Sequence, residues 1–456
     1  MSAPLAVTAA PGTKRDSVTG FSGVDCVFAT ALPRNAGNLN DQTRDAVESI
    51  RAAIAAQHAA AVNQVVFVED PAWIPSCRHM MRELYGDQLP ATTFIPQPPC
   101  EGKGIAIEAL GLRTNGPDLK IERHGEHLLV ARFQGMDWVF AAGAAPRTSA
   151  PGVYEKSACA LQQLRRLLPK GGAHFSQIVR AWFYLGSIVA EEGDHQRYHE
   201  FNRARTDFYE DVRFLQDRLP EGVADRVFPA STGIGVNGKR ICMSAIAVAS
   251  SRSDVVAVPL ENPRQTSAYR YGKSYSPQTP KFSRGMALHC GRDTMLFVSG
   301  TASITNSETR HPGNAELQTH ETLENIAALI SKENLARHGL AGSGTTLDGL
   351  AVIRAYVKRP EDYEKVREVC QSRLGAIPAT YVVADVCRPD LLVEIEGVAM
   401  SHAAGPIASV CRTTSLSFVE SDCSGQHGPH CPSTCPELHV CPHASIRPEG
   451  ESGAAS

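Results

Sequence analysis

Two carboxylic acids, Glu394 and Glu396, lie two residues apart in the apolar run LLVEIEG (391–397). If this run forms a strand, alternation places Leu392 and both acids on the same face. Neighbouring carboxylates repel each other, so each raises the pKa of the other, and apolar surroundings raise it further. A carboxyl that stays protonated near neutral pH can serve as a general acid. The alternative is that both acids are solvent-facing charges on an edge strand, and the strand pattern alone slightly favours it.

Three arginines are candidates for binding an anionic ligand, namely Arg205, Arg264 and Arg284. A planar guanidinium bonds a carboxylate through two parallel hydrogen bonds. A surface ion pair is nevertheless the ordinary role of any single arginine. In RYHEFNRAR (197–205), helical spacing places Tyr198 on the same face as Arg205, which favours a buried-facing arginine.

The segment 261–284 is rich in hydrogen-bonding aromatic side chains. It contains Tyr269, Tyr271 and Tyr275, whose hydroxyls could bond a ligand while their rings exclude water. Gln265 adds an amide that binds either a carboxylate or a hydroxyl. The alternative is aromatic packing of a linker between domains.

Cysteine and histidine are concentrated near the end of the sequence. Four of them could supply tetrahedral zinc ligands: Cys431, Cys435, Cys441 and His443. Their spacings, C-x3-C and then C-x5-C, fit no standard zinc finger or ribbon. We therefore favour a flexible tail over a metal site.

The composition is that of an ordinary globular protein. The chain has 456 residues, of which 43% are hydrophobic and 20% charged, and its formal net charge is -3. It therefore has no excess of positive charge for binding a nucleic-acid backbone. It has neither an apolar run long enough to span a membrane nor a signal-peptide pattern, so we expect a cytoplasmic protein. Walker, GxGxxG, nucleophile-elbow and HExxH motifs are absent as well, and we expect no cofactor.

An internal repeat organises the chain. Three segments are alike, LPATTF (89–94), FPASTG (228–233) and IPATYV (377–382), and an apolar strand pattern follows each one. Helical patterns and a run rich in β-branched and aromatic residues precede each one. We predict three α+β units of order β-β-α-β-α-β-β, with helices on one face of each sheet.

Three such units in one chain suggest a single-chain pseudo-trimer, either monomeric or assembled further into a homo-oligomer. Ligand sites would then lie in the clefts between adjacent units. The predicted boundaries are a flexible leader (1–20), a first repeat (21–115), a second repeat (116–255), a linker (256–284), a third repeat (285–403) and a flexible tail (404–456).

This order of elements, with its Pro-Ala turns and final EIE, resembles the YjgF/Rid family of trimers with a chorismate-mutase-like subunit fold. In that family an Arg directly after Pro-Ala binds a substrate carboxylate, and a Glu in the last strand handles the water that hydrolyses an imine. The Arg positions hold Thr92, Ser231 and Thr380, and the Glu positions hold Ala106, Cys242 and Glu394. The resemblance therefore implies this fold for the units. Only the third unit keeps a glutamate, Glu394, at the Glu position of the family.

A closer resemblance is to the chorismatases, hydrolases that cleave pyruvate from chorismate. Four segments match in order, namely RYHEFNRAR (197–205), the segment 261–284, SGTASITNSETRHPGN (299–314) and ADVCRPDLLVEIEG (384–397). The resemblance implies a hydrolase of secondary metabolism with a small-molecule substrate and no cofactor. It also implies that the arginines, tyrosines and Gln265 bind the two substrate carboxylates and the ring oxygens.

In this resemblance Glu394 is the acid that protonates the methylene carbon of the enolpyruvyl ether. A Cys at position 387 accompanies enzymes that release 3-hydroxybenzoate rather than a dihydroxycyclohexadiene carboxylate, although a lone cysteine such as Cys387 is more commonly a buried small side chain. One departure is Phe183, which follows Trp182 where the family usually has Asn. Two alternatives remain, a Rid-type imine or enamine deaminase and a non-catalytic ligand-binding Rid-like protein.

Overall fold

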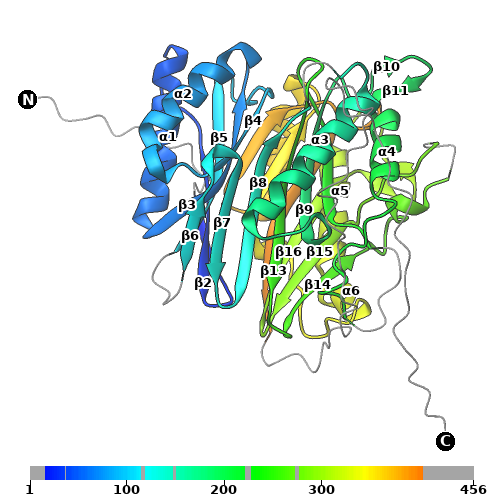
Figure 1. Cartoon of the computed structure of the whole chain (residues 1–456). Helices are drawn as coiled ribbons and strands as arrows, with labels where there is room; N and C mark the ends of the chain where they lie inside the picture. The colour runs from blue at the N-terminus through cyan, green and yellow to red at the C-terminus, as the bar shows by residue number, and fades with distance from the viewer. Residues whose placement is uncertain are drawn as a thin grey trace, which may run out of the picture. The chain divides into compact units, whose positions relative to one another are not determined.

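The computed structural model describes residues 16–35, 37–113, 119–146, 150–220, 227–272 and 277–403. Within these ranges the chain forms three large sheets with helices packed on them (Figure 1). No helix in the described ranges is both long and apolar enough to cross a membrane. The predicted Cys/His-rich tail lies outside the described residues.

The first sheet has five strands in the order β1-β2-β5-β3-β4. The strands are β1 (Asp16–Phe21), β2 (Val24–Ala31), β3 (Ala59–Val68), β4 (Ala91–Ile95) and β5 (Ile105–Arg113). Its helices are α1 (Leu39–Ala56) and α2 (Ile74–Tyr85). The side chain of Asn38 caps α1, and the helix buries one apolar stripe at helical spacing: Ala46, Val47, Ile50 and Ile54.

The second sheet has six strands in the order β12-β9-β13-β8-β7-β6. The strands are β6 (Lys120–Arg123), β7 (Leu128–Phe133), β8 (Met136–Ala144), β9 (Ile178–Gly186), β12 (Ala230–Val236) and β13 (Ile241–Ser250). Its helices are α3 (Val153–Leu167) and α4 (Arg197–Phe208), which lie together in Figure 1. A short hairpin precedes α4, formed by β10 (Glu191–Glu192) and β11 (His195–Gln196).

The third sheet also has six strands, in the order β14-β15-β16-β21-β19-β20. The strands are β14 (Val255–Leu260), β15 (Gly285–Cys290), β16 (Asp293–Ala302), β19 (Leu350–Val357), β20 (Ala379–Val383) and β21 (Val393–His402). Its helices are α5 (Ala315–Ile330), α6 (Lys332–Arg337) and α7 (Tyr363–Leu374). A hairpin of β17 (Ile304–Thr305) and β18 (Glu308–Thr309) leads from β16 toward α5.

The three sheets share one strand order. In each, the strand after the Pro-Ala turn (β4, β12 or β20) pairs in parallel with the strand between the two helices (β3, β9 or β19). The closing strand (β5, β13 or β21) pairs antiparallel with that same strand. The predicted α+β class and the predicted closing strands are therefore confirmed.

Two predicted boundaries are wrong. The leader (1–20) was expected to be flexible, but Asp16–Phe21 forms β1 and pairs with β2. The linker (256–284) begins with a strand, because β14 pairs with β15 and adds an edge to the third sheet. In both cases hydrogen bonds to a neighbouring strand satisfy the backbone N–H and C=O groups of a segment whose sequence did not predict a strand.

The sheets pack against one another through a shared apolar cluster. Its buried members come from all three: Val65, Phe67, Ile95, Ala106, Tyr184, Ile234, Val236, Ala302, Ile304, Tyr356, Val382, Ala384, Val386 and Leu391. Two of these residues, Tyr184 and Tyr356, carry hydroxyls, and both bond the buried Arg354. The contact between sheets therefore combines apolar packing with a buried charged network.

Candidate active site

A cavity of about 410 Å³ lies where the second and third sheets meet. The elements that line it include α4, β12, β16, β21 and the segments before β15 and β21. Among its lining residues are six that the sequence singled out: Tyr198, Arg205, Tyr271, Arg284, Cys387 and Glu394. Residues nearly 200 positions apart in the chain are thus brought to one place by the packing of two sheets.

Glu394 lies on β21 and is 5% exposed. It is paired on one side with Ala302 of β16 and on the other with Tyr356 of β19, so β21 is an interior strand. A β-bulge in β16 surrounds Gly300, and a Cβ at Gly300 would lie 2.1 Å from Glu394 Oε1. The glycine therefore makes the space that the carboxyl occupies.

The pKa of Glu394 is raised to about 8. Burial is the main cause and the charge of Glu396 adds to it, while Arg180 and Arg284 oppose the shift. The alternative of solvent-facing charges on an edge strand is therefore wrong. Glu394 is a buried carboxyl that is largely protonated at neutral pH, and it faces a cavity.

Glu396 lies two residues further along β21, and its pKa is shifted in the opposite direction. Its carboxylate accepts hydrogen bonds from Arg180 (2.6 Å), from Trp182 Nε1 (2.9 Å) and from Thr232. Arg354 forms an ion pair with it at 2.8 Å. Burial opposes ionisation of Glu396, but Arg354 and Arg180 together with these hydrogen bonds hold its pKa below its ordinary value.

The same network reaches the first sheet. Arg354 Nη2 donates to Glu108 on β5 at 2.8 Å, and Arg354 Nη1 donates to Tyr184 at 3.1 Å and to Tyr356 at 3.2 Å. The Arg354 guanidinium also lies 4.9 Å from the ring centroid of Phe67. One ionised cluster thus links all three sheets behind the cavity, and a buried ion pair of this kind is costly to break.

Arg205 is fully enclosed on α4, as its helical spacing predicts. Its Nη2 donates to Asn202 at 2.7 Å, and its guanidinium lies 4.8 Å from the ring centroid of Phe201 and 5.5 Å from that of Phe183. Its Nε is a buried donor without a hydrogen-bond acceptor among the described residues. Tyr198 lines the same wall, and burial raises the pKa of its hydroxyl above the ordinary value.

Arg284 and Arg388 supply further cationic groups to the wall of the cavity. Arg284 Nη2 donates to Tyr271 Oη at 2.5 Å and to the Thr266 carbonyl at 2.9 Å. Arg388 donates to the Ser307 carbonyl at 2.8 Å, and its guanidinium lies 5.4 Å from the ring centroid of Tyr271. The Tyr271 ring therefore contacts both guanidinium groups and holds them at the cavity wall.

Cys387 lines the cavity close to the acid. Burial, and then the charge of Glu394, raise the pKa of its thiol to about 12. The side chain is therefore a neutral thiol rather than a thiolate nucleophile.

Three predicted ligand-binding residues lie elsewhere. Arg264 forms ion pairs with α5, at 2.8 Å to Glu321 and 3.8 Å to Glu324. Gln265 donates to the Ile304 carbonyl at 2.9 Å, and the Tyr269 ring packs 5.5 Å from that of Phe228. These three side chains fasten the segment to its surroundings and are not among the residues that line the cavity, so their role in ligand binding stays a prediction.

Some predictions fall outside the described residues, namely those for Tyr275, Cys431, Cys435, Cys441 and His443. Among the residues that the structure does describe, no group of three or more His, Cys, Asp or Glu side chains is placed to hold a metal ion.

Sequence reasoning missed the partners of Glu396 and the cationic group of Arg388. Arg180 and Arg354 are lone charges inside the apolar runs IVRAWFYL (178–185) and LAVIRAYV (350–357), which is the pattern of buried ion pairs. That signal was available from the sequence, but the identity of the partner depends on how the sheets pack.

Comparison with known proteins gives two family matches along the chain. A model described as chorismatase FkbO/Hyg5-like, N-terminal, matches residues 119–247, and one described as endoribonuclease L-PSP matches residues 277–401. A 3-hydroxybenzoate synthase of Streptomyces hygroscopicus is 37% identical over 284 residues, which are 61% of this chain and 78% of that protein. A chorismatase of Streptomyces rapamycinicus is 37% identical over 233 residues, which are 50% of this chain and 65% of that protein.

A solved structure has a similar fold. The crystal structure of a chorismatase, 22% identical in sequence, covers 84% of this chain and 99% of its own with a TM-score of 0.58. The buried acid and the arginines of the cavity lie within the part of this chain covered by the two family models, whereas Tyr271 lies between the two matched ranges.

Proposed function

The chain belongs to the chorismatase family of chorismate-cleaving enzymes, and we propose that Glu394 is the general acid of the reaction. The reaction is hydrolysis of the enolpyruvyl ether of chorismate. Its products are pyruvate and a dihydroxycyclohexadiene carboxylate. If this carboxylate then loses one water, the ring product is 3-hydroxybenzoate. The observation that carries the proposal is a buried carboxyl that shares a cavity with arginines, and burial raises its pKa.

The chemistry requires a proton on carbon. Neutral Glu394 gives its proton to the terminal methylene carbon, and the enol ether becomes an oxocarbenium ion. The carboxylate left on Glu394 stabilises this cation electrostatically. Water then adds to the cationic carbon, and the resulting hemiketal breaks its bond to the ring oxygen. Pyruvate leaves, the ring keeps a hydroxyl, and a proton returns to Glu394.

Two substrate carboxylates require two cationic partners. Arg205 and Arg284 each have a buried Nε donor without an acceptor in the described part of the chain, and one substrate carboxylate would satisfy each of them. Arg388 adds positive charge to the wall on the Arg284 side. Tyr198 and Tyr271 also line the cavity, and in this proposal their hydroxyls bond the ring oxygens.

Cys387 is the group that we assign to the choice of product. Its neutral thiol adjoins Glu394 and presents a weakly polar surface to the ring. In this proposal such a surface keeps solvent water from the ring and favours the dehydrated, aromatic product. The similarity to a protein named 3-hydroxybenzoate synthase supports 3-hydroxybenzoate as that product.

The shared strand order supports the three-repeat architecture as well. In this proposal the sheets are Rid-like repeats that form a pseudo-trimer, with the repeat boundaries corrected at β1 and β14. The chain is then a cytoplasmic protein that is either monomeric or assembled into homo-oligomers. The positions equivalent to the Rid arginine hold Thr92, Ser231 and Thr380, so the deaminase alternative is not favoured.

The test is incubation of the purified chain with chorismate. Pyruvate release is followed with lactate dehydrogenase, and the ring product is identified by mass spectrometry. We expect stoichiometric pyruvate and 3-hydroxybenzoate. A folded protein that binds chorismate and releases no pyruvate above background would instead support the non-catalytic alternative.

A further inference from the structure

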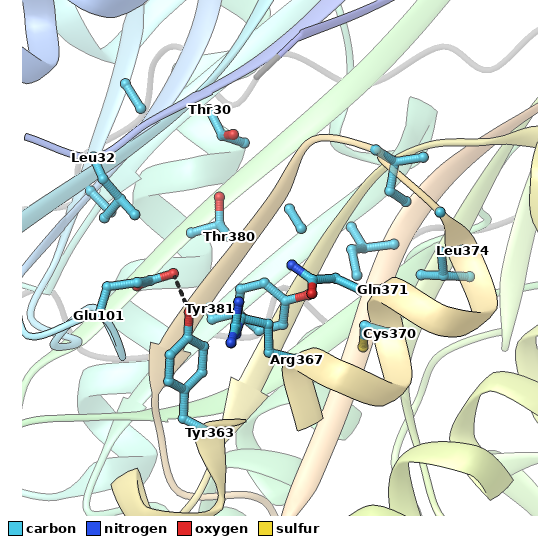
Figure 2. A pocket seen from close by; sticks show the side chains of 16 residues that line it. Thr30, Leu32, Glu101, Tyr363, Arg367, Cys370, Gln371, Leu374, Thr380 and Tyr381 are labelled. Atoms are coloured by element: carbon cyan, nitrogen blue, oxygen red, sulfur yellow. Dashed lines mark hydrogen bonds between the residues drawn. The ribbon is translucent and has the colours of Figure 1, made fainter. Parts of the chain in front are cut away.

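A second cavity, of about 220 Å³, lies between the first and third sheets (Figure 2). Thr30, Leu32 and Glu101 contribute to its wall on the side of the first sheet. Tyr363 of α7 and Thr380 of β20 contribute on the other side. No residue assigned to the proposed reaction lines this cavity.

The polar groups of this cavity are incompletely satisfied. Tyr363 Oη donates to Glu101 Oε1 at 3.2 Å, while Glu101 Oε2 is buried and has no hydrogen-bond partner in the described residues. The same holds for Thr380 Oγ1, whose residue is 5% exposed. In Figure 2 a dashed line joins the Glu101 carboxyl to the Tyr363 hydroxyl. Unpaired buried oxygens are costly, and a ligand with a suitable hydrogen-bonding group would remove that cost.

The rest of the wall is mainly apolar, with Ala106, Ile353 and Leu374 among its members. The nearest guanidinium, that of Arg367, already donates its Nε to Glu364 at 3.1 Å. Burial raises the pKa of Glu101 to about 7, so it carries negative charge above that pH. This balance disfavours an anionic ligand and favours a neutral one with a ring and a hydrogen-bonding group.

The second cavity also lacks a counterpart of Glu394 on its closing strand. Ala106 pairs across the ladder with the aromatic Phe67, as Glu394 pairs with Tyr356. A methyl group therefore stands where the other cleft has a carboxyl, and a ligand there would be bound without proton transfer from the closing strand.

We propose that this second cleft binds a small, neutral, hydroxylated single-ring compound. The hydroxyl donates to Glu101 Oε2 and accepts from Thr380 Oγ1, and the ring covers the apolar wall. The inference stands independently of the reaction proposed for the first cavity, because it rests on residues of a different cleft.

The test uses 4-fluorophenol as the probe and fluorine NMR as the readout, with the full chain as the protein. We expect saturable binding of 4-fluorophenol and at least about tenfold weaker binding of 4-fluoroanisole, because its capped hydroxyl cannot donate to Glu101.

Matched variants assign the binding to one cleft. Glu101→Leu should weaken 4-fluorophenol binding by about tenfold or more, whereas Glu394→Leu, the same change in the other cleft, should leave it within about twofold. Ala379→Leu adds volume to the second cleft without removing a charge and should abolish binding. It keeps the test decisive if Glu101→Leu does not fold, with circular dichroism as the check on folding.

Three results would overturn the inference. These are an absence of saturable binding, equal affinity for the phenol and the anisole, or binding that is lost in Glu394→Leu and retained in Glu101→Leu. Pyruvate release from chorismate is measured separately, so failure of the reaction and failure of this site are distinguishable.

Discussion

The two clefts beside the third sheet occupy similar places in the strand order and differ in their chemistry. In the larger cleft, the closing strand itself supplies the acid, Glu394, and arginines from neighbouring elements face it. In the smaller cleft, the closing strand supplies Ala106, and the carboxyl comes from Glu101 in the turn before that strand. The topology thus creates the cavities, while the side chain at one strand position decides whether the closing strand supplies a carboxyl to the cavity.

A second contrast lies within β21. Glu394 and Glu396 are both buried and two residues apart, yet the pKa of the first is raised and that of the second is lowered. The difference follows from their partners, because Arg180 and Arg354 bond Glu396 directly and influence Glu394 less. One carboxylate is fixed as an anion so that its neighbour remains an acid.

The largest expected effect is that of Glu394→Gln. The amide cannot protonate carbon, so kcat for pyruvate release should fall by about 10³-fold. The matched control is Glu368→Gln, which makes the same change at an exposed position on α7 and should leave kcat within about twofold. An unchanged rate in Glu394→Gln would remove the assigned acid.

Glu396→Gln should chiefly lower stability. It leaves Arg180 and Arg354 as buried cations with a weakened partner, so the free energy of unfolding should fall by about 3–5 kcal/mol in urea titrations. Arg203→Ala breaks the exposed pair with Glu200 and should cost less than about 1 kcal/mol. Equal losses for the two variants would mean that the buried network is not a stabilising unit.

Arg284→Gln tests two roles of Arg284 together, the binding of a substrate carboxylate and the effect of its charge on the pKa of Glu394. Loss of a guanidinium that bonds a substrate carboxylate should raise KM by about 10- to 100-fold. Arg284 also opposes the raised pKa of Glu394, so its removal should move the alkaline limb of the activity profile to higher pH. A rise in KM with no movement of that limb would separate the two roles.

The pH profile of the unmodified chain measures the acid directly. The active form carries the proton, so kcat/KM should be highest below pH 8 and should fall about tenfold per pH unit above it, because Glu394 then ionises. A profile that rises through pH 8 would indicate a base in place of an acid.

The smallest effect should be that of Arg264→Ala. Its side chain pairs with Glu321 and Glu324 and does not line the cavity, so turnover should stay within about twofold. Stability should change by less than about 1 kcal/mol. A large rise in KM would restore Arg264 to the ligand-binding residues.

Much of the fold could be predicted because its signals are local. Alternating and continuous apolar runs identified the closing strands, and helical spacing predicted that Arg205 faces inward. The edge strands β1 and β14 escaped prediction because their stability comes from pairing with a distant segment rather than from their own composition. The segment 261–284 was informative by resemblance, but the sequence did not show which of its side chains line the cavity. Tyr271 and Arg284 do so, whereas Arg264, Gln265 and Tyr269 do not.

The sequence by itself determined the repeated α+β pattern, the presence of two acids two residues apart in one apolar strand and the presence of charges within other apolar strands. These features follow from residue type and from spacing along the chain, because side-chain direction in helices and strands repeats with a fixed period. The tertiary structure alone decided that Glu396 is bonded by Arg180 and Arg354 while Glu394 is left protonated. A pKa depends on burial and on charges a few ångströms away, and those distances exist only once separate sheets have packed together.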